Sequence, residues 1–194
     1  MVESFLIPKQ DYLSVGIHIG MKSKTKDMEK FIYKVREDGL AVLNLKMLDE
    51  RINTAAKFLS RTNKILVVGR KPNSHSPIKK FCEIVGCDCS IGRFIPGILT
   101  NPNYEKFTEP DVVLLVDPLS DKQVLKEALD SRIPIIALCD TLNETKYIDL
   151  IIPCNNKGRK SLAMIFWLLA REIMKHKEKK EFKHKLEDFI GEGS

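Results

Sequence analysis

The sequence predicts an α/β protein that is doubly wound, with a mostly parallel sheet, helices on both faces and an N-terminal hairpin or arm. Runs of consecutive apolar residues at 64–69, 111–116, 133–138 and 148–152 are typical of parallel strands buried on both faces. Segments with helical periodicity alternate with these runs, which is the pattern of βαβ units. The 194 residues are enough for one sizeable core.

The N-terminal part predicts a short helix at 9–15 and then a hairpin. Asp38-Gly39 separates two apolar-rich runs at 31–35 and 41–45, and an Asp-Gly pair in that position is a strong hairpin signal. His18, between two glycines and without a nucleophile motif nearby, is interpreted as a packed, hydrogen-bonded turn residue.

The remaining elements follow from apolar spacing. Leu48, Ile52, Ala55 and Leu59 recur at helical intervals, so 46–61 is predicted to be an amphipathic helix. By the same reasoning, helices are expected at 78–85, 124–129 and 158–175, and a further short strand at 89–92. Within the last helix, Phe166 and Trp167 lie on apolar stripes, so both are predicted to be core residues rather than platforms for stacked bases.

A long connection at 91–102 has apolar residues but neither helical nor alternating period. Loops of this kind are usually functional or disordered, and the apolar content argues against disorder. We therefore expect a functional loop here.

Three parts are expected along the chain: an N-terminal arm at 1–30, the α/β domain at 31–176 and a charged extension at 177–194. The extension is basic and then acidic, and it could contact RNA or a neighbouring protein. The arm and the start of the domain carry six cations, which are Lys22, Lys24, Lys26, Lys30, Lys34 and Arg36.

Charge indicates an acidic partner. The chain has 32 Lys and Arg against 26 Asp and Glu, a net charge of +6 and a pI near 9.0, which describes a mildly basic surface. No signal-peptide pattern opens the sequence and no apolar run approaches the length of a membrane span. The expectation is a soluble cytoplasmic protein without a membrane partner.

The five cysteines do not form a disulfide-like framework. Cys139 and Cys154 lie in apolar runs, where a free cysteine behaves as a small buried hydrophobe. Cys82, Cys87 and Cys89 lack the paired spacing and the histidine partner of a zinc finger. We expect a reducing compartment and no metal.

The carboxyl ends of parallel strands are where ligands collect, so enzyme motifs are sought there. No turn supplies the three glycines of a dinucleotide-binding loop, and Arg159 and Cys154 stand where a phosphate loop ending at Lys160-Ser161 would need glycine. Asp117 and Asp140 could form an acid–base or metal-binding pair, but carboxylates at strand ends more often cap a helix or order a turn. The prediction is no catalytic residue, no cofactor, no metal and no small-molecule substrate; a flavodoxin-like enzyme using these two aspartates is the alternative.

A polyanion site is predicted where the last strand passes into the last helix. The turn 155–160 combines three cations with the first N–H groups of a helix, and both favour phosphate. These residues alone leave open whether the phosphate belongs to a nucleotide or to a nucleic acid backbone.

Four segments carry a resemblance to a known family: GRFIPGILTNP, EPDVVLLVDP, IPIIALCDT and IIPCNNKGRKSLAMIFWLLARE, preceded by GIHIG near the N-terminus. Together they resemble the small-subunit ribosomal protein S-two family, in the archaeal and eukaryotic branch that includes the laminin-receptor-precursor relatives. The resemblance covers about residues 13–172. One departure is Met21-Lys22-Ser23, where the family commonly has a Thr-Gln pair. The long acidic tail of the eukaryotic members is missing from the sequence, which favours an archaeal-type protein.

The resemblance implies a flavodoxin-like, Rossmann-like domain without catalytic activity. It implies a structural constituent of the small ribosomal subunit that binds its ribosomal RNA and neighbouring ribosomal proteins, supporting assembly and translation. A free RNA-binding or adhesion module outside the ribosome is the other alternative.

Phosphate contacts position a protein on RNA and weaken with salt. The candidate RNA-binding residues are Lys22, Lys24, Lys26, Arg36, Arg70, Lys71, Arg93, Asn155, Asn156, Lys157, Arg159 and Lys160.

Overall fold

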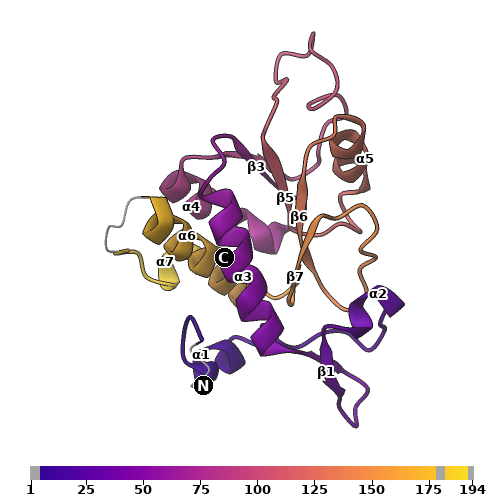
Figure 1. The fold of residues 1–194 in the computed structure, drawn as a ribbon, viewed down its shortest axis with the longest axis vertical. Helices are drawn as coiled ribbons and strands as arrows, with labels where there is room; N and C mark the ends of the chain where they lie inside the picture. The colour runs from indigo at the N-terminus through magenta and orange to yellow at the C-terminus, as the bar shows by residue number, and fades with distance from the viewer. Residues whose placement is uncertain (1–4, 178–181, 192–194) are drawn as a thin grey trace.

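The computed structural model describes residues 5–177 and 182–191 and contains a five-stranded parallel sheet (Figure 1). Its strands are β3 (Ile65–Gly69), β4 (Asp88–Ile91), β5 (Val112–Leu115), β6 (Ile135–Cys139) and β7 (Leu150–Pro153). They lie in the order β4-β3-β5-β6-β7, and every neighbouring pair is parallel. The predicted α/β fold with a parallel sheet is confirmed.

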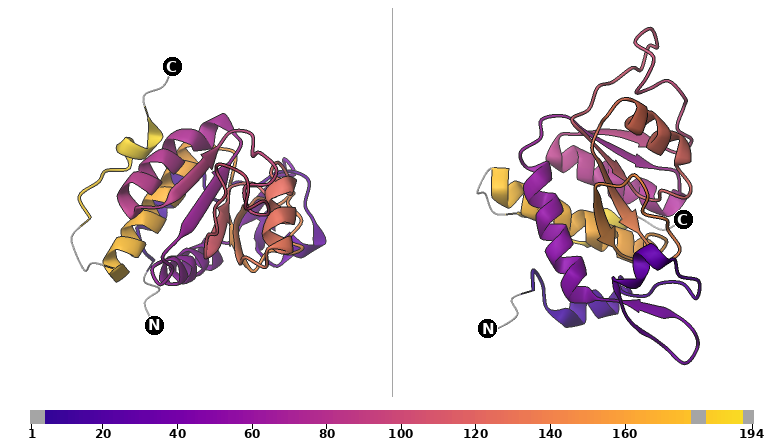
Figure 2. Two further views of the ribbon diagram at one scale, coloured as in Figure 1. Left: turned by 90° about the horizontal axis from the view of Figure 1, so that it is seen from above. Right: turned by 45° about the vertical axis from the view of Figure 1, so that its right-hand side comes forward.

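Alternate residues of each strand face two separate cores. Ile65 and Val67 pack with helices α3 (Leu45–Leu59), α4 (Pro72–Val85) and α6 (Arg159–Lys177) on one face. Leu66 and Val68 face the other side, which α5 (Lys122–Asp130) covers. Figure 2 shows the sheet between these two layers. Burial on both faces explains why the strands read as continuous apolar runs.

The long connection after β4 completes the cover of the second face. Phe94, Ile98 and Leu99 are buried in the same core as α5. Glu127 of α5 fixes the loop because its carboxylate accepts the N–H groups of Gly97 (2.9 Å) and Leu99 (3.2 Å). The apolar residues that suggested a functional loop are therefore core residues.

Helix α4 begins at Pro72, six residues before the predicted start at 78. Two prolines, Pro72 and Pro77, lie in the part of the helix that was not predicted. Pro72 occupies the first helical turn, where its missing N–H has no intrahelical partner to lose. Pro77 lies inside the helix and is itself buried, so tertiary packing overrides its local cost.

The predicted N-terminal hairpin is confirmed. β1 (Ile32–Val35) pairs antiparallel with β2 (Ala41–Leu43), next to the short helices α1 (Lys9–Ser14) and α2 (Lys26–Glu29). Gly39 turns the chain with a φ of +84°, which glycine adopts without strain.

Thr141, which follows β6, ties the arm to the sheet. Its hydroxyl accepts the Met21 N–H at 2.9 Å and donates to the Ser23 carbonyl at 3.1 Å. These bonds use the backbone of the 21–23 turn, so they do not depend on which side chains stand there. Gly20 is required because an added Cβ would come within 2.4 Å of the Thr141 methyl group.

The C-terminal part folds back onto α4 and α6 through α7 (Glu187–Ile190), whose Phe189 is fully buried. Phe166 is a core residue as predicted and meets the Phe81 ring edge-on at 5.3 Å. Trp167 is only partly buried: its indole N–H donates to the His184 carbonyl at 2.9 Å. The part of the extension at 178–181 and 192–194 lies outside the described residues. Within the described ranges, no helix has the length and apolarity to cross a bilayer.

Candidate nucleic-acid interface

The strand order places a topological switch point between β3 and β5. From β3 the chain goes outward to the edge strand β4 and then returns to form β5 on the other side of β3. In open α/β sheets the crevice beyond this point is the usual ligand site. Here the residues that follow the two strands are Arg70 and Lys71 after β3 and Asp117 after β5.

An internal ion pair fills this position. Lys71 Nζ lies 2.6 Å from Asp117 Oδ2, which also accepts the Ser120 hydroxyl at 2.7 Å. Burial alone would raise the pKa of Asp117, but the Lys71 ammonium and the hydrogen bonds from Ser120 and Asn143 hold it below its usual value. The Asp117 carboxylate thus orders the turn after β5, as predicted.

The polar network continues along the strand ends to β7. Asn143 donates to Asp117 Oδ1 at 2.8 Å and accepts the Asp140 N–H at 2.7 Å. The fully buried Asn156 donates to the Asn143 side chain at 3.1 Å and to the Leu138 carbonyl at 2.9 Å. Lys157 closes the chain of contacts with an ion pair to Asp140 at 3.3 Å.

The predicted polyanion turn is held by its own side chains. Asn155 Oδ1 accepts the N–H groups of Lys157 and Gly158, each at 3.1 Å, which orders the turn that leads into α6. Arg159 points to the C-terminal segment, where it donates to the carbonyls of Ile190 (2.9 Å) and Gly191 (2.6 Å). Of the three cations in the turn, Lys160 is the exposed one.

The structure thus divides the twelve RNA-binding candidates by environment. Lys24 and Arg36 form surface ion pairs with Glu29 (3.3 Å) and Asp38 (3.1 Å). Lys71, Asn155, Asn156, Lys157 and Arg159 are held by internal contacts. The remaining candidates are exposed and have no ion pair among the described residues: Lys22, Lys26, Arg70, Arg93 and Lys160.

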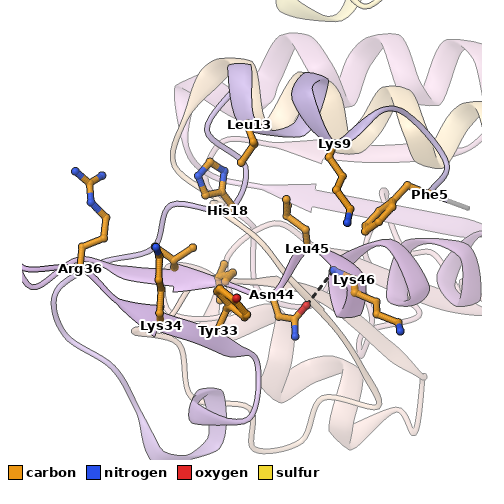
Figure 3. Close-up of a pocket in the computed structure, with 12 residues that line it drawn as sticks. Phe5, Lys9, Leu13, His18, Tyr33, Lys34, Arg36, Asn44, Leu45 and Lys46 are labelled. Atoms are coloured by element: carbon orange, nitrogen blue, oxygen red, sulfur yellow. Dashed lines mark hydrogen bonds between the residues drawn. The ribbon is translucent and has the colours of Figure 1, made fainter. Parts of the chain in front are cut away.

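A groove of about 750 Å³ lies between the arm, the hairpin and the start of α3 (Figure 3). Among the described residues that line it, the Lys and Arg side chains are Lys9, Lys34, Arg36 and Lys46, and none is acidic. Tyr33 is 71% exposed beside them. Sequence reasoning missed this groove because its residues come from distant segments, although the cation-rich stretch from Lys22 to Arg36 marked one of its walls.

His18 lines the same groove and lies in a turn, where it makes a hydrogen bond with the Tyr12 backbone. Its Nδ1 is buried and lacks a hydrogen-bond partner among the described residues. Burial, more than the nearby Arg36 charge, lowers the pKa of His18. The predicted packed, hydrogen-bonded turn histidine is therefore confirmed, although Nδ1 takes no part in that hydrogen bond.

The two aspartates of the alternative enzyme hypothesis are both held by internal contacts. Asp117 and Asp140 are committed to Lys71 and Lys157, and Asp140 also accepts the Thr141 N–H at 2.7 Å. In the described part of the chain, no group of three His, Cys, Asp or Glu side chains is arranged to hold a metal ion. Internal ion pairs and hydrogen bonds therefore hold both strand-end aspartates.

Asp121 is a buried carboxyl group in this region that destabilises the folded protein when it is ionised. Asp121 is 3% exposed, and its Oδ2 has no partner among the described residues. Burial and the nearby Asp117 charge raise its pKa to about 6, although a hydrogen bond from the Arg70 backbone acts in the opposite direction. Its contribution to stability is therefore full below the unfolded pKa of about 3.9 and is lost as the pH rises through about 6.

Asp121→Asn should consequently raise the free energy of unfolding at pH 7.5 by about 1–3 kcal/mol, with the gain disappearing near pH 4. Urea unfolding of both proteins at the two pH values measures this. A gain of the same size at both pH values would assign the effect to packing and contradict ionisation as its cause.

Comparisons with known proteins show which family the sequence matches. The family described as Ribosomal protein S2, which is the S-two family above, matches residues 12–107 and 104–176. The chain is 54% identical over 178 residues to the small ribosomal subunit protein uS2 of the archaeon Staphylothermus marinus. The alignment covers 91% of this chain and 81% of that relative.

Proposed function

Because this chain belongs to the ribosomal protein S2 family, we propose that it binds small-subunit ribosomal RNA and neighbouring small-subunit proteins. It is a structural component of the small ribosomal subunit, of the archaeal type, and not an enzyme. As a ribosomal component it is expected in the cytoplasm.

The observation that carries the RNA-binding proposal is that five of the twelve candidate residues are exposed and have no ion pair among the described residues. Lys22 and Lys26 lie on the arm, Arg70 directly after β3, Arg93 in the loop after β4 and Lys160 in the first turn of α6. Exposed Lys and Arg can neutralise phosphates without first breaking an internal contact, and this releases the counterions condensed on RNA. We call these five residues the exposed cation set.

The other candidates support this set in different ways. Lys24 and Arg36 belong to exposed ion pairs, which are worth so little that phosphate can displace the acid. Lys71, Lys157, Asn155 and Asn156 hold the strand-end turns in shape and present Lys160 and Arg70 to the RNA. Arg36 and Lys34 also give the N-terminal groove its positive charge, so an anionic segment of RNA or of a neighbouring protein is its proposed occupant.

Fractionation of a cell lysate on sucrose gradients tests the proposal. At physiological salt the protein should migrate with small subunits, and raised salt should release it progressively because phosphate contacts weaken with ionic strength. A protein that stays at the top of the gradient at physiological salt would support a free module. Release that is insensitive to salt would contradict phosphate contacts as the main source of affinity.

A further inference from the structure

Two cysteines meet at the end of α4. Cys87 Sγ lies 3.1 Å from Cys82 Sγ and donates to it. Cys82 is 8% exposed in the last turn of the helix, whereas Cys87 is half-buried just beyond it. No covalent bond joins them, since all five cysteines are free thiols.

The backbone holds this pair together independently of the thiols. Gly86 ends α4 in the left-handed conformation with a φ of +74°, and the N–H groups of Gly86 and Cys87 both bond to the Cys82 carbonyl, at 2.9 and 3.2 Å. This arrangement is a Schellman-type helix end, in which the residue after the glycine normally makes an apolar contact with the last helical turn. Here that contact is thiol on thiol, so the two sulfur atoms are kept adjacent by the fold.

We propose that Cys82 and Cys87 are a modification site: a hydroperoxide oxidises them to an intramolecular disulfide that thiol reductants reverse. The proposal does not depend on the ribosomal role. The two sulfur atoms need to approach by about 1 Å to reach the disulfide bond length.

The reaction proceeds in two steps that balance. The deprotonated Cys87 sulfur attacks one peroxide oxygen, the O–O bond breaks, and an alcohol, or water from hydrogen peroxide, leaves with a proton; Cys87 becomes a sulfenic acid. The Cys82 sulfur then attacks the Cys87 sulfur, the S–O bond breaks, and the hydroxyl leaves as water with the proton of Cys82. Two thiols lose two electrons and the peroxide gains them.

Accessibility assigns the order of the two cysteines. Cys87 is the more exposed of the two, and the hydrogen bond with Cys87 together with burial raises the pKa of the Cys82 thiol far above its usual value. A buried thiol that is rarely ionised reacts slowly with a free peroxide, so Cys87 takes the first step. Cys82 takes the second because the Cys87 sulfur lies next to it. Cys89, which is exposed on the edge strand β4, is a neighbour of Cys82 and is the competing partner that the experiment must exclude.

The sequence makes the pairing directly measurable. Trypsin releases all three cysteines on one peptide, residues 81–93, and a second cleavage before Asp88 separates 81–87 from 88–93. The purified, folded, reduced protein is treated with hydrogen peroxide, alkylated and digested in this way. The expected product is a peptide 81–87 that has lost two hydrogen atoms, together with an alkylated Cys89, and dithiothreitol should restore both thiols.

Two variants complete the test. Cys89→Ser should leave the product unchanged, and Cys87→Ser, checked for a native circular dichroism spectrum, should abolish it. Oxidation should also raise the Tm of the Cys89→Ser protein by about 5 °C, because a short loop in the unfolded chain is closed. A disulfide joining the two peptides, or stable oxygen addition at Cys87 without loss of the Cys82 thiol, would overturn the proposal.

Discussion

Replacing the exposed cation set, Lys22, Lys26, Arg70, Arg93 and Lys160, by glutamine is expected to weaken binding to small-subunit RNA by about 10²- to 10⁴-fold at 0.1 M salt. Each phosphate contact that is lost removes the release of its counterion. The slope of log K against log salt should therefore flatten by about one unit for each contact. The free energy of unfolding should change little, because surface substitutions away from buried networks are usually nearly neutral.

Filter binding or fluorescence anisotropy with protein-depleted small-subunit RNA, measured at several salt concentrations, gives the affinity and its salt dependence. The matched control removes the same charge elsewhere, through glutamine at five exposed lysines on α3, α4, α5 and the loop after β4: Lys57, Lys79, Lys106, Lys122 and Lys126. The control should lose much less affinity. Equal losses in both variants would show that net charge decides binding, and the assignment of an RNA-facing surface would be wrong.

Asp117→Ala is expected to lower the free energy of unfolding by about 3–5 kcal/mol. The substitution leaves Lys71 beside the closed strand ends without its counter-ion and removes the acceptor of the Asn143 and Ser120 donors. Removing one member of a buried ionic network costs more than the network itself contributes, because the remaining polar groups stay desolvated.

The same substitution carries a pH signature. The folded pKa of Asp117 lies below its usual value, so its stabilisation is present above about pH 4 and is lost as the pH falls through the folded pKa. The difference between the two proteins should therefore shrink below about pH 4 in urea titrations. Asp38→Ala is the control, since its ion pair with Arg36 is half exposed and should contribute at most about 1 kcal/mol. If Asp117→Ala lowered the free energy of unfolding as little as Asp38→Ala, water would be taking over the hydrogen bonds of the lost carboxylate, and the predicted cost would be wrong.

Exposure and partners were not readable from the sequence. Lys71 and Lys157 look like surface cations in a loop, yet both face aspartates that follow other strands. Asn156 stands in a polar turn but is fully buried. No local pattern distinguishes these residues from Lys160, because their partners come from other parts of the chain.

The sequence by itself determined the parallel sheet, the order of its helices, the hairpin and the family. A strand that is buried on both faces is a continuous run of apolar residues, and a helix that packs on one side has apolar residues with a period of 3.6. Both patterns can be read from neighbouring residues in the sequence. Only the tertiary structure decided which cations remain exposed, that the loop after β4 is core, and that the strand-end aspartates are neutralised internally. Those outcomes depend on contacts between strand ends that lie far apart in sequence, and the parallel sheet is what brings them to one edge.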